Sequence, residues 1–164
     1  MNYIFLVMDL MQGGSLKDLI IERFNGQGNF FNEEECAIII RNILEGLRYL
    51  NSIKVVHRDI KPENIMIKKK GDLNSVTIVD FGFSTIIGGN DNEENNCGTL
   101  IYMSPETHKK QVHDTTDSWS TGFILYILCS GGQHPLYKQG MSFDQYSSML
   151  KSGKEWTFQE NFPM

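Results

Sequence analysis

Apolar residues recur at helical spacing in two long stretches of the chain. In the first, Asn32 stands before three glutamates at 33–35, an order typical of a helix N-cap followed by acids in the first turn. The apolar positions that follow lie mostly three or four residues apart: Cys36, Ile39, Ile40, Ile43, Leu47 and Leu50. This spacing predicts one long amphipathic helix that ends near Asn51. A second helix is predicted over residues 114–129, and its apolar second half, 123–129, is expected to be buried.

Shorter apolar runs predict strands. The first eight residues, MNYIFLVM, form a nearly continuous apolar run, which predicts a strand covered on both faces. Residues 65–67 and 76–79 flank a polar stretch that contains the turn signal Gly71-Asp72, so a β-hairpin is expected there. Between these regions, residues 16–24 are predicted to form a short helix with Ser15 as its N-cap.

Composition and charge limit the classes of function. The 164 residues are 40% hydrophobic, which suits a globular chain and excludes a disordered tail. The formal charge of −5 gives no whole-chain attraction to nucleic acid or anionic lipid, so neither is an expected partner. The longest apolar run has seven residues, whereas crossing a bilayer takes about 20, so no membrane segment is expected. Three scattered cysteines, Cys36, Cys97 and Cys129, fit a reducing, cytoplasmic compartment.

Four short motifs follow one another in the middle of the chain. They are HRDIKPEN (57–64), DFG (80–82), CGT with SPE (97–99 and 104–106) and DSWSTG (117–122). DFG begins 21 residues after Asp59, and Glu106 of SPE lies 26 residues beyond Asp80. At these residues the sequence resembles the eukaryotic protein kinases, and the resemblance covers essentially the whole chain. The KPEN wording resembles the Ser/Thr kinases, and among them most closely the calcium/calmodulin-dependent group.

The resemblance implies a phosphoryl transfer from ATP to serine or threonine hydroxyls of protein substrates. In this chemistry the enzyme aligns a hydroxyl and stabilises charge on the moving group. The resemblance implies that Asp59 orients the hydroxyl and accepts its proton, and that Lys61 neutralises charge on the transferred phosphate. Thr99 would help to place Asp59. Asn64 and Asp80 would offer oxygens to Mg²⁺, a hard cation that prefers oxygen ligands.

The same resemblance assigns further positions to nucleotide binding. Asp9 and Met11, through their backbone groups, correspond to the hinge that binds adenine after the gatekeeper Met8. Met66 corresponds to the floor beneath the adenine. Glu63 is included in the cofactor-binding set, and it is also an acid seen where basic residues upstream of the target are recognised. The set is completed by three residues of the catalytic loops, Lys61, Asn64 and Asp80.

Other motif residues are expected to have structural or regulatory roles. Asp117 should accept backbone N–H groups from the HRD loop, and His57 should stack with Phe81. Arg58 is a residue that usually accompanies control by a phosphate in the activation segment. Asn95 stands where that phosphate acceptor is expected, and acidic residues precede it. Either these carboxylates substitute for the phosphate opposite Arg58, or they form a merely solvated loop.

The implied fold is α+β: a truncated protein-kinase-like fold with a mostly helical C-lobe and a small β-hairpin. Residues 1–12 would be the hinge strand and hinge, and residues 13–164 an incomplete C-lobe. The family pattern also requires a glycine-rich loop, a strand lysine and a helix glutamate, and this chain begins after all three. We therefore expect an active parent protein, weak activity for the isolated chain, partly uncovered residues 123–129 and room for a regulatory domain outside the chain.

Two other classes of function stay open at this point. A non-catalytic, pseudokinase-like binding module fits a chain that cannot by itself enclose ATP, although the catalytic positions are intact. A glycine-rich loop and a strand lysine upstream of Met1 would decide between this class and an active kinase. A small-molecule phosphotransferase shares the logic of Asp59, Asn64 and Asp80, but it would not be expected to carry the KPE and CGT…SPE segments.

Overall fold

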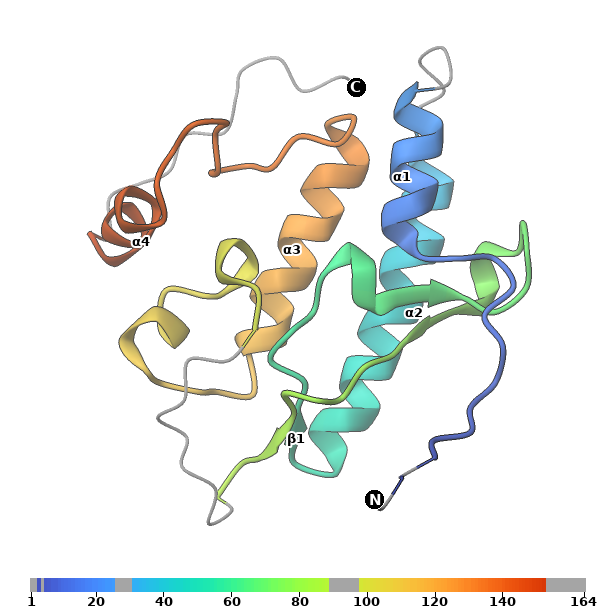
Figure 1. Cartoon of the computed structure of the whole chain (residues 1–164), viewed down its shortest axis with the longest axis horizontal. Coiled ribbons are helices and arrows are strands. Elements are labelled where there is room, and N and C mark those ends of the chain that lie inside the picture. Colours follow the sequence, from blue (N-terminus) through green and yellow to red (C-terminus); the bar gives the residue numbers. More distant parts are fainter. Residues whose placement is uncertain (1–2, 4, 26–30, 89–97, 153–164) are drawn as a thin grey trace.

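The structure is a computed structural model that describes residues 3, 5–25, 31–88 and 98–152 (Figure 1). The described helices are α1 (Leu16–Asn25), α2 (Glu33–Ser52), α3 (Thr116–Cys129) and α4 (Phe143–Lys151). The described strands are β1 (Val55–Val56), β2 (Ile65–Ile67), β3 (Val76–Ile78) and β4 (Thr85–Ile86). Short 3₁₀ turns connect them: η1 (Pro62–Asn64), η2 (Leu73–Ser75), η3 (Leu100–Tyr102) and η4 (Thr107–Lys109).

Helix α2 forms almost where the sequence predicts it. The backbone N–H of Glu35 donates to Asn32 Oδ1 at 2.9 Å, and Asn32 N–H donates to Glu35 Oε2 at 3.0 Å, which makes a capping box. The helix buries one apolar stripe: Cys36, Ile39, Ile43, Leu47 and Leu50. This stripe packs against α3 and the β2–β3 hairpin, so α2 is the centre of the core.

Helix α3 begins at Thr116, two residues later than the prediction, and ends at Cys129 as predicted. Most of its second half is buried; Leu125 is 41% exposed and Cys129 is half-buried. The expectation that 123–129 is partly uncovered is therefore confirmed only at Leu125 and Cys129. Phe123 packs with Tyr146 and Leu150 of α4, a helix that the sequence did not predict, whereas Ile124 and Leu128 pack in the cluster around α2. Within the described residues, no helix combines the length and apolar character needed to cross a membrane.

The predicted hairpin is confirmed as the antiparallel pair β2–β3, with Ile65 opposite Ile78 and Ile67 opposite Val76. The chain before α1 runs along the other side of β2: Gly13 N–H donates to Ile67 O, and Ile67 N–H donates to Gly14 O, each at 2.9 Å. A second, unpredicted pair joins β1 to β4, antiparallel. Strand β1 directly precedes the HRDIKPEN segment (57–64) and β2 directly follows it, so the two strand pairs fix the two ends of this segment.

The predicted N-terminal strand is wrong for the residues that the structure describes there. Residues 3 and 5–8 have no strand conformation, and Phe5, Leu6 and Val7 are 87%, 82% and 94% exposed. An apolar run forms a covered strand only where neighbouring strands satisfy its backbone groups. No described strand pairs with this segment. Figure 1 shows it as an extended stretch that leads to the start of α1.

Candidate functional site

The carboxylate of Asp59 is the centre of a closed hydrogen-bond cluster. Asp59 is 3% exposed and follows β1 by three residues. Its Oδ1 accepts from Thr99 N–H at 2.7 Å and from Thr99 Oγ1 at 2.9 Å. Its Oδ2 lies 2.7 Å from Lys61 Nζ and accepts from Asn64 Nδ2 at 2.9 Å. Four donors from three residues therefore fix one orientation of this carboxylate. Asp59, Lys61, Asn64 and Thr99 are hereafter called the Asp59 cluster.

Lys61 connects the two halves of the cluster. Its Nζ donates to Thr99 Oγ1 at 2.7 Å while it also pairs with Asp59. The Lys61 side chain is 19% exposed, so the ammonium lies at the edge of the cluster and not deep within it. An ammonium at this place can neutralise an anion that arrives next to Asp59.

Gly98 allows the two segments of the cluster to meet. A Cβ at this position would lie 2.3 Å from the carbonyl oxygen of Arg58, a distance that no side chain can occupy. Gly98 also has φ of +106°, in a region that favours glycine. The sequence analysis took Gly98 only as part of the CGT motif, and its packing role was missed. Cys97, the first residue of that motif, lies outside the described residues.

The N-terminal end of α3 holds the loop that carries Asp59. Asp117, 2% exposed, accepts His57 N–H at 2.7 Å through Oδ2 and Arg58 N–H at 2.9 Å through Oδ1, so the predicted contact is confirmed. Burial raises the pKa of the Asp117 carboxyl, and the backbone N–H groups of His57 and Arg58 partly oppose this. These two bonds pin the loop to the most buried helix of the fold.

His57 joins the HRD loop to the DFG loop. Asp59 N–H donates to His57 Nδ1 at 3.3 Å, so Nδ1 has no proton and the Nε2–H donates to Val79 O at 3.0 Å. The imidazole also contacts Phe81 edge-on, with ring centroids 4.9 Å apart, as the sequence analysis expected. Val79, which directly precedes Asp80, is thus hydrogen-bonded to His57, two residues before Asp59.

Asn64 and Asp80 offer the oxygens that a hard cation needs. Asn64 Nδ2 donates to the backbone and side-chain oxygens of Asp59, which leaves Oδ1 as the amide atom for a cation. Val79 N–H donates to Asn64 O at 2.9 Å, so the two loops run side by side at this point. Asp80 has φ of +64° and is exposed, and within the described part of the chain its Oδ1 accepts only a weak bond, from Gly82 N–H at 3.3 Å. This donor set fits Mg²⁺.

The predicted adenine-binding residues lie along the β2–β3 hairpin and the chain segment beside it. Asp9 is exposed and forms an ion pair with Lys68, which together with their hydrogen bond lowers the pKa of the Asp9 carboxyl. Met11 and Met66 are both half-buried, Met66 within β2. Among the described residues, no hydrogen bond or ion pair joins Asp9 or Met11 to the cluster. The structure brings together the residues of the HRD and CGT motifs and leaves these three at the hairpin.

Glu63 and Arg58 lie at the edge of the site with partly satisfied side chains. Glu63 Oε1 is 3.1 Å from Lys17 Nζ, whereas its Oε2 is buried without a partner in the described part of the chain. Arg58 Nε donates to Phe83 O at 2.6 Å, and its Nη1 is likewise buried and unpartnered among the described residues. The acidic loop before Asn95, expected opposite Arg58, lies outside the described residues.

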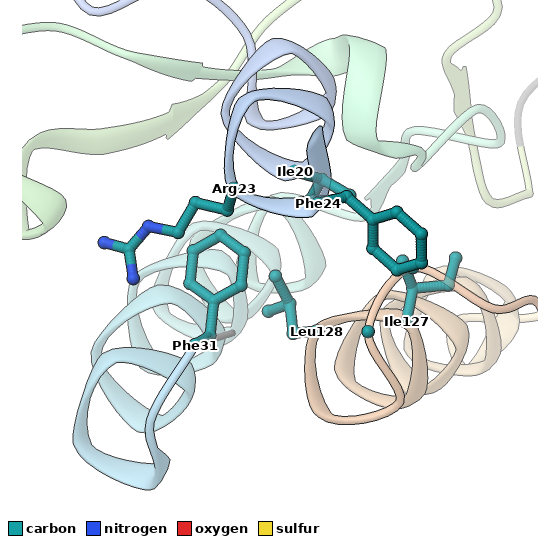
Figure 2. A pocket seen from close by; sticks show the side chains of 8 residues that line it. Ile20, Arg23, Phe24, Phe31, Ile127 and Leu128 are labelled. Atoms are coloured by element: carbon teal, nitrogen blue, oxygen red, sulfur yellow. The ribbon is translucent and has the colours of Figure 1, made fainter. Parts of the chain in front are cut away.

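The cavity in Figure 2 is separate from this site. It lies between α1, the start of α2 and the end of α3, and it has room for about one water, near 10 Å³. Arg23 closes one side: its guanidinium binds both carboxylate oxygens of Glu35, at 2.8 and 2.7 Å, and lies 4.6 Å from the Phe31 ring centroid. The Arg23 contact lowers the pKa of the Glu35 carboxyl. The cavity is a small packing gap, too small for a nucleotide.

Comparison with known proteins gives two findings. A family model described as "Protein kinase domain" matches residues 1–163. Myosin light chain kinase A of Dictyostelium discoideum is 39% identical over 129 residues, which cover 78% of this chain and 42% of that relative. Calcium-dependent protein kinase 4 of Plasmodium berghei is 40% identical over 131 residues, which cover 79% of this chain and 24% of that relative. The chain thus spans about two fifths of the first relative's length and about a quarter of the second's.

Proposed function

Because this chain belongs to the protein kinase family, we propose that it carries the phosphoryl-transfer residues of a protein serine/threonine kinase. The reaction would move the γ-phosphoryl group of ATP to a serine or threonine hydroxyl of a protein substrate. One observation carries the proposal: Lys61 contacts both Asp59 and Thr99, so base, cation and positioning hydroxyl form one rigid unit. A solvated polar loop would not hold four donors on one carboxylate.

In this proposal Asp59 is the group that meets the substrate hydroxyl. Because Thr99 and Asn64 fix its orientation, Asp59 can align the hydroxyl oxygen for attack and accept its proton at a carboxylate oxygen. Lys61 stabilises the negative charge that develops beside it. Asn64 and Asp80 would hold Mg²⁺, which, when bound with ATP, neutralises phosphate charge.

The nucleotide base would bind at the hairpin side of the site. We propose that backbone groups of Asp9 and Met11 bind adenine, with Met66 beneath it, and Glu63 stays assigned to the binding set. What supports this is the path of the chain: the segment after Met11 runs along β2, which contains Met66, and β2 directly follows the loop that carries Asn64. The short strand β2 would then connect the proposed base site to Asn64, one of the two proposed magnesium ligands.

Partners and surroundings belong to the same proposal at a coarser level. The two relatives carry names that refer to different things, a myosin light chain and calcium, so we propose only the class of substrate: proteins with accessible Ser or Thr. Binding of nucleic acid or membrane is not proposed. A regulatory domain outside these 164 residues is also proposed. A cytoplasmic setting is proposed because the three cysteines are scattered along the sequence and form no disulfide framework there.

The experiment compares the full-length protein with its Asp59→Asn variant. ADP formation from Mg-ATP is measured with a peptide library that offers serine, threonine and tyrosine hydroxyls as acceptors. We expect D59N to lower kcat by about 10²-fold or more, because the proton acceptor is lost. ATP binding, followed by displacement of a fluorescent nucleotide, should change little. Asp144→Asn, at an exposed carboxylate in the first turn of α4, is the matched control and should keep wild-type rates.

Three results would contradict the proposal. Equal rates of phosphate transfer by the wild-type protein and D59N would exclude Asp59 as the group that accepts the proton of the substrate hydroxyl. Tight ATP binding without any transfer by the wild-type protein would instead support the pseudokinase-like binding module. The peptide products also test the hydroxyl class, since phosphotyrosine alone would exclude a Ser/Thr kinase.

A further inference from the structure

Three side-chain donors bind backbone carbonyl groups of the segment directly after Thr99. Ile101 O accepts a hydrogen bond from Tyr146 Oη at 2.7 Å and lies 3.0 Å from His134 Nε2. The next carbonyl, of Tyr102, accepts from Ser120 Oγ at 2.7 Å. These donors come from α4, from the loop after α3 and from α3 itself. Ser120 belongs to the DSWSTG motif, whereas His134 and Tyr146 lie outside all four motifs.

The contacts of His134 determine where its proton lies. The backbone N–H groups of Leu136 and Tyr137 point at Nδ1, at 3.2 and 2.8 Å. Both groups can only donate, so Nδ1 is the unprotonated acceptor and the single proton is on Nε2. His134 therefore donates to Ile101 O, and the neutral ring satisfies all three contacts at once. A charged ring would turn an N–H towards two N–H donors.

The surroundings of His134 favour this neutral form. Its ring is packed among aromatic rings, with centroids 4.7 Å from Phe123, 5.7 Å from Tyr102 and 6.0 Å from Tyr146. Burial lowers the pKa of His134 to about 4, and the bond to Ile101 opposes this only in part. The imidazole is thus a fixed structural donor at neutral pH, not a free surface base.

The contacts of His134 and Tyr146 with the Ile101 carbonyl are hereafter called the clamp. A single turn connects the clamp to the Asp59 cluster. Residues Leu100–Tyr102 form η3, and Tyr102 N–H donates back to Thr99 O at 2.9 Å. Because the turn is closed, the position of the Ile101 carbonyl limits where Thr99 can lie. Thr99 is the residue whose N–H and hydroxyl both bind Asp59. A shift of η3 would therefore be passed on to the carboxylate.

We propose that His134 and Tyr146 are positioning residues, which together hold η3 so that Thr99 keeps its bonds to Asp59 and Lys61. They touch neither the carboxylate nor the ammonium, and they act only through the Ile101 carbonyl. A hydrophobic side chain at 134 would fill the space but remove one donor and one acceptor. Glutamine can replace both, because its Nε2 can donate and its Oε1 can accept.

The kinetic meaning of this clamp rests on the proposed function, whereas its structural effect does not. The first measurement is therefore amide hydrogen exchange of Thr99 in the full-length protein, which needs no activity. In His134→Leu we expect Thr99 to exchange about tenfold faster, the factor that corresponds to one lost hydrogen bond. His134→Gln should restore slow exchange. His113→Leu, at an exposed histidine, should have no effect, and amides in α2 should stay unchanged in all variants.

The second measurement is kcat and KM for phosphate transfer. H134L should lower kcat and leave the KM for ATP unchanged, and H134Q should recover kcat. If H134L does not fold, Tyr146→Phe carries the test, because it keeps the ring and removes the other donor to Ile101; it should also speed Thr99 exchange. Unchanged Thr99 exchange in H134L, or in Y146F where H134L cannot be made, overturns the proposal. Faster Thr99 exchange in H134L, together with no phosphate transfer by the wild-type protein, would uphold the role of His134 in holding η3 and refute the kinase activity.

Discussion

At the scale of single residues, Gly98 has the least tolerance for change in the candidate site. We predict that Gly98→Ala lowers kcat for phosphate transfer by at least about tenfold, because the new methyl group would meet the Arg58 carbonyl at 2.3 Å and push Thr99 away from Asp59. Steady-state kinetics of the full-length protein measure this, with Thr99 amide exchange as the structural readout.

Gly71→Ala is the matched control for that prediction. Gly71 also has a positive φ, +79°, but its added Cβ would have no atom within 4 Å. G71A should therefore show only the backbone cost, about 1 kcal/mol of stability, and leave kcat unchanged. A G98A protein with wild-type kcat would show that the close approach to Arg58 is not needed for activity.

The sequence could predict that certain residues lie together but not how they are held. Asp59, Lys61, Asn64 and Thr99 stand in motifs, and the resemblance to protein kinases assigned them to one site, where the structure shows them in contact. The roles of Gly98 and His134 depend on approaches between residues 40 and 33 positions apart along the chain, Gly98 to Arg58 and His134 to Ile101. Such an approach has no local signature. His134 is flanked by glycines, a glutamine and a proline, an order typical of a loop, and nothing there indicates its bond to Ile101.

At the scale of secondary-structure elements, the N-cap of α2 contributes directly to the stability of the core. We predict that Asn32→Ala lowers the free energy of unfolding by about 1 kcal/mol, since the Glu35 N–H loses its acceptor at the start of the most central helix. Urea unfolding followed by circular dichroism measures the change.

Asn32→Asp separates the cap from other effects of the substitution. Aspartate keeps an oxygen acceptor in the same place, so N32D should match the wild-type midpoint within experimental error. A destabilisation of N32D equal to that of N32A would mean that the asparagine acts through something other than its cap oxygen.

Elements were predictable where a periodic pattern and a turn signal agreed. The α2 helix has both a cap and an apolar stripe, and the β2–β3 hairpin has two short apolar runs on either side of the turn signal Gly71-Asp72, so both predictions are confirmed. Helix α4 was missed although Ser142 and Gln145 form a capping box at its start. The pair β1–β4 has two residues in each strand and depends on a long-range contact that no local pattern shows.

At the scale of the whole molecule, two histidines with lowered pKa values make stability depend on pH. His134 has a folded-state pKa of about 4 against an ordinary value of 6.5, and burial lowers the pKa of His108 in the same direction. Below pH 6.5 the unfolded chain therefore binds protons that the folded protein does not, and stability falls as pH decreases towards 4. Asp117 acts in the opposite sense, because its raised pKa lets the folded protein bind a proton first.

A comparison of the wild-type protein with His134→Gln isolates one of these groups. Glutamine keeps the two kinds of hydrogen bond but cannot titrate, while His108 and Asp117 are the same in both proteins. Between pH 7 and pH 5 we predict that the wild-type protein loses more unfolding free energy than H134Q, by at most about 2 kcal/mol. Urea unfolding at pH 7, 6 and 5 measures this, with His113→Gln expected to follow the wild-type curve. Parallel curves for the wild-type protein and H134Q would show that His134 is not held neutral in the folded state, and the tautomer on which its bond to Ile101 depends would then be wrong.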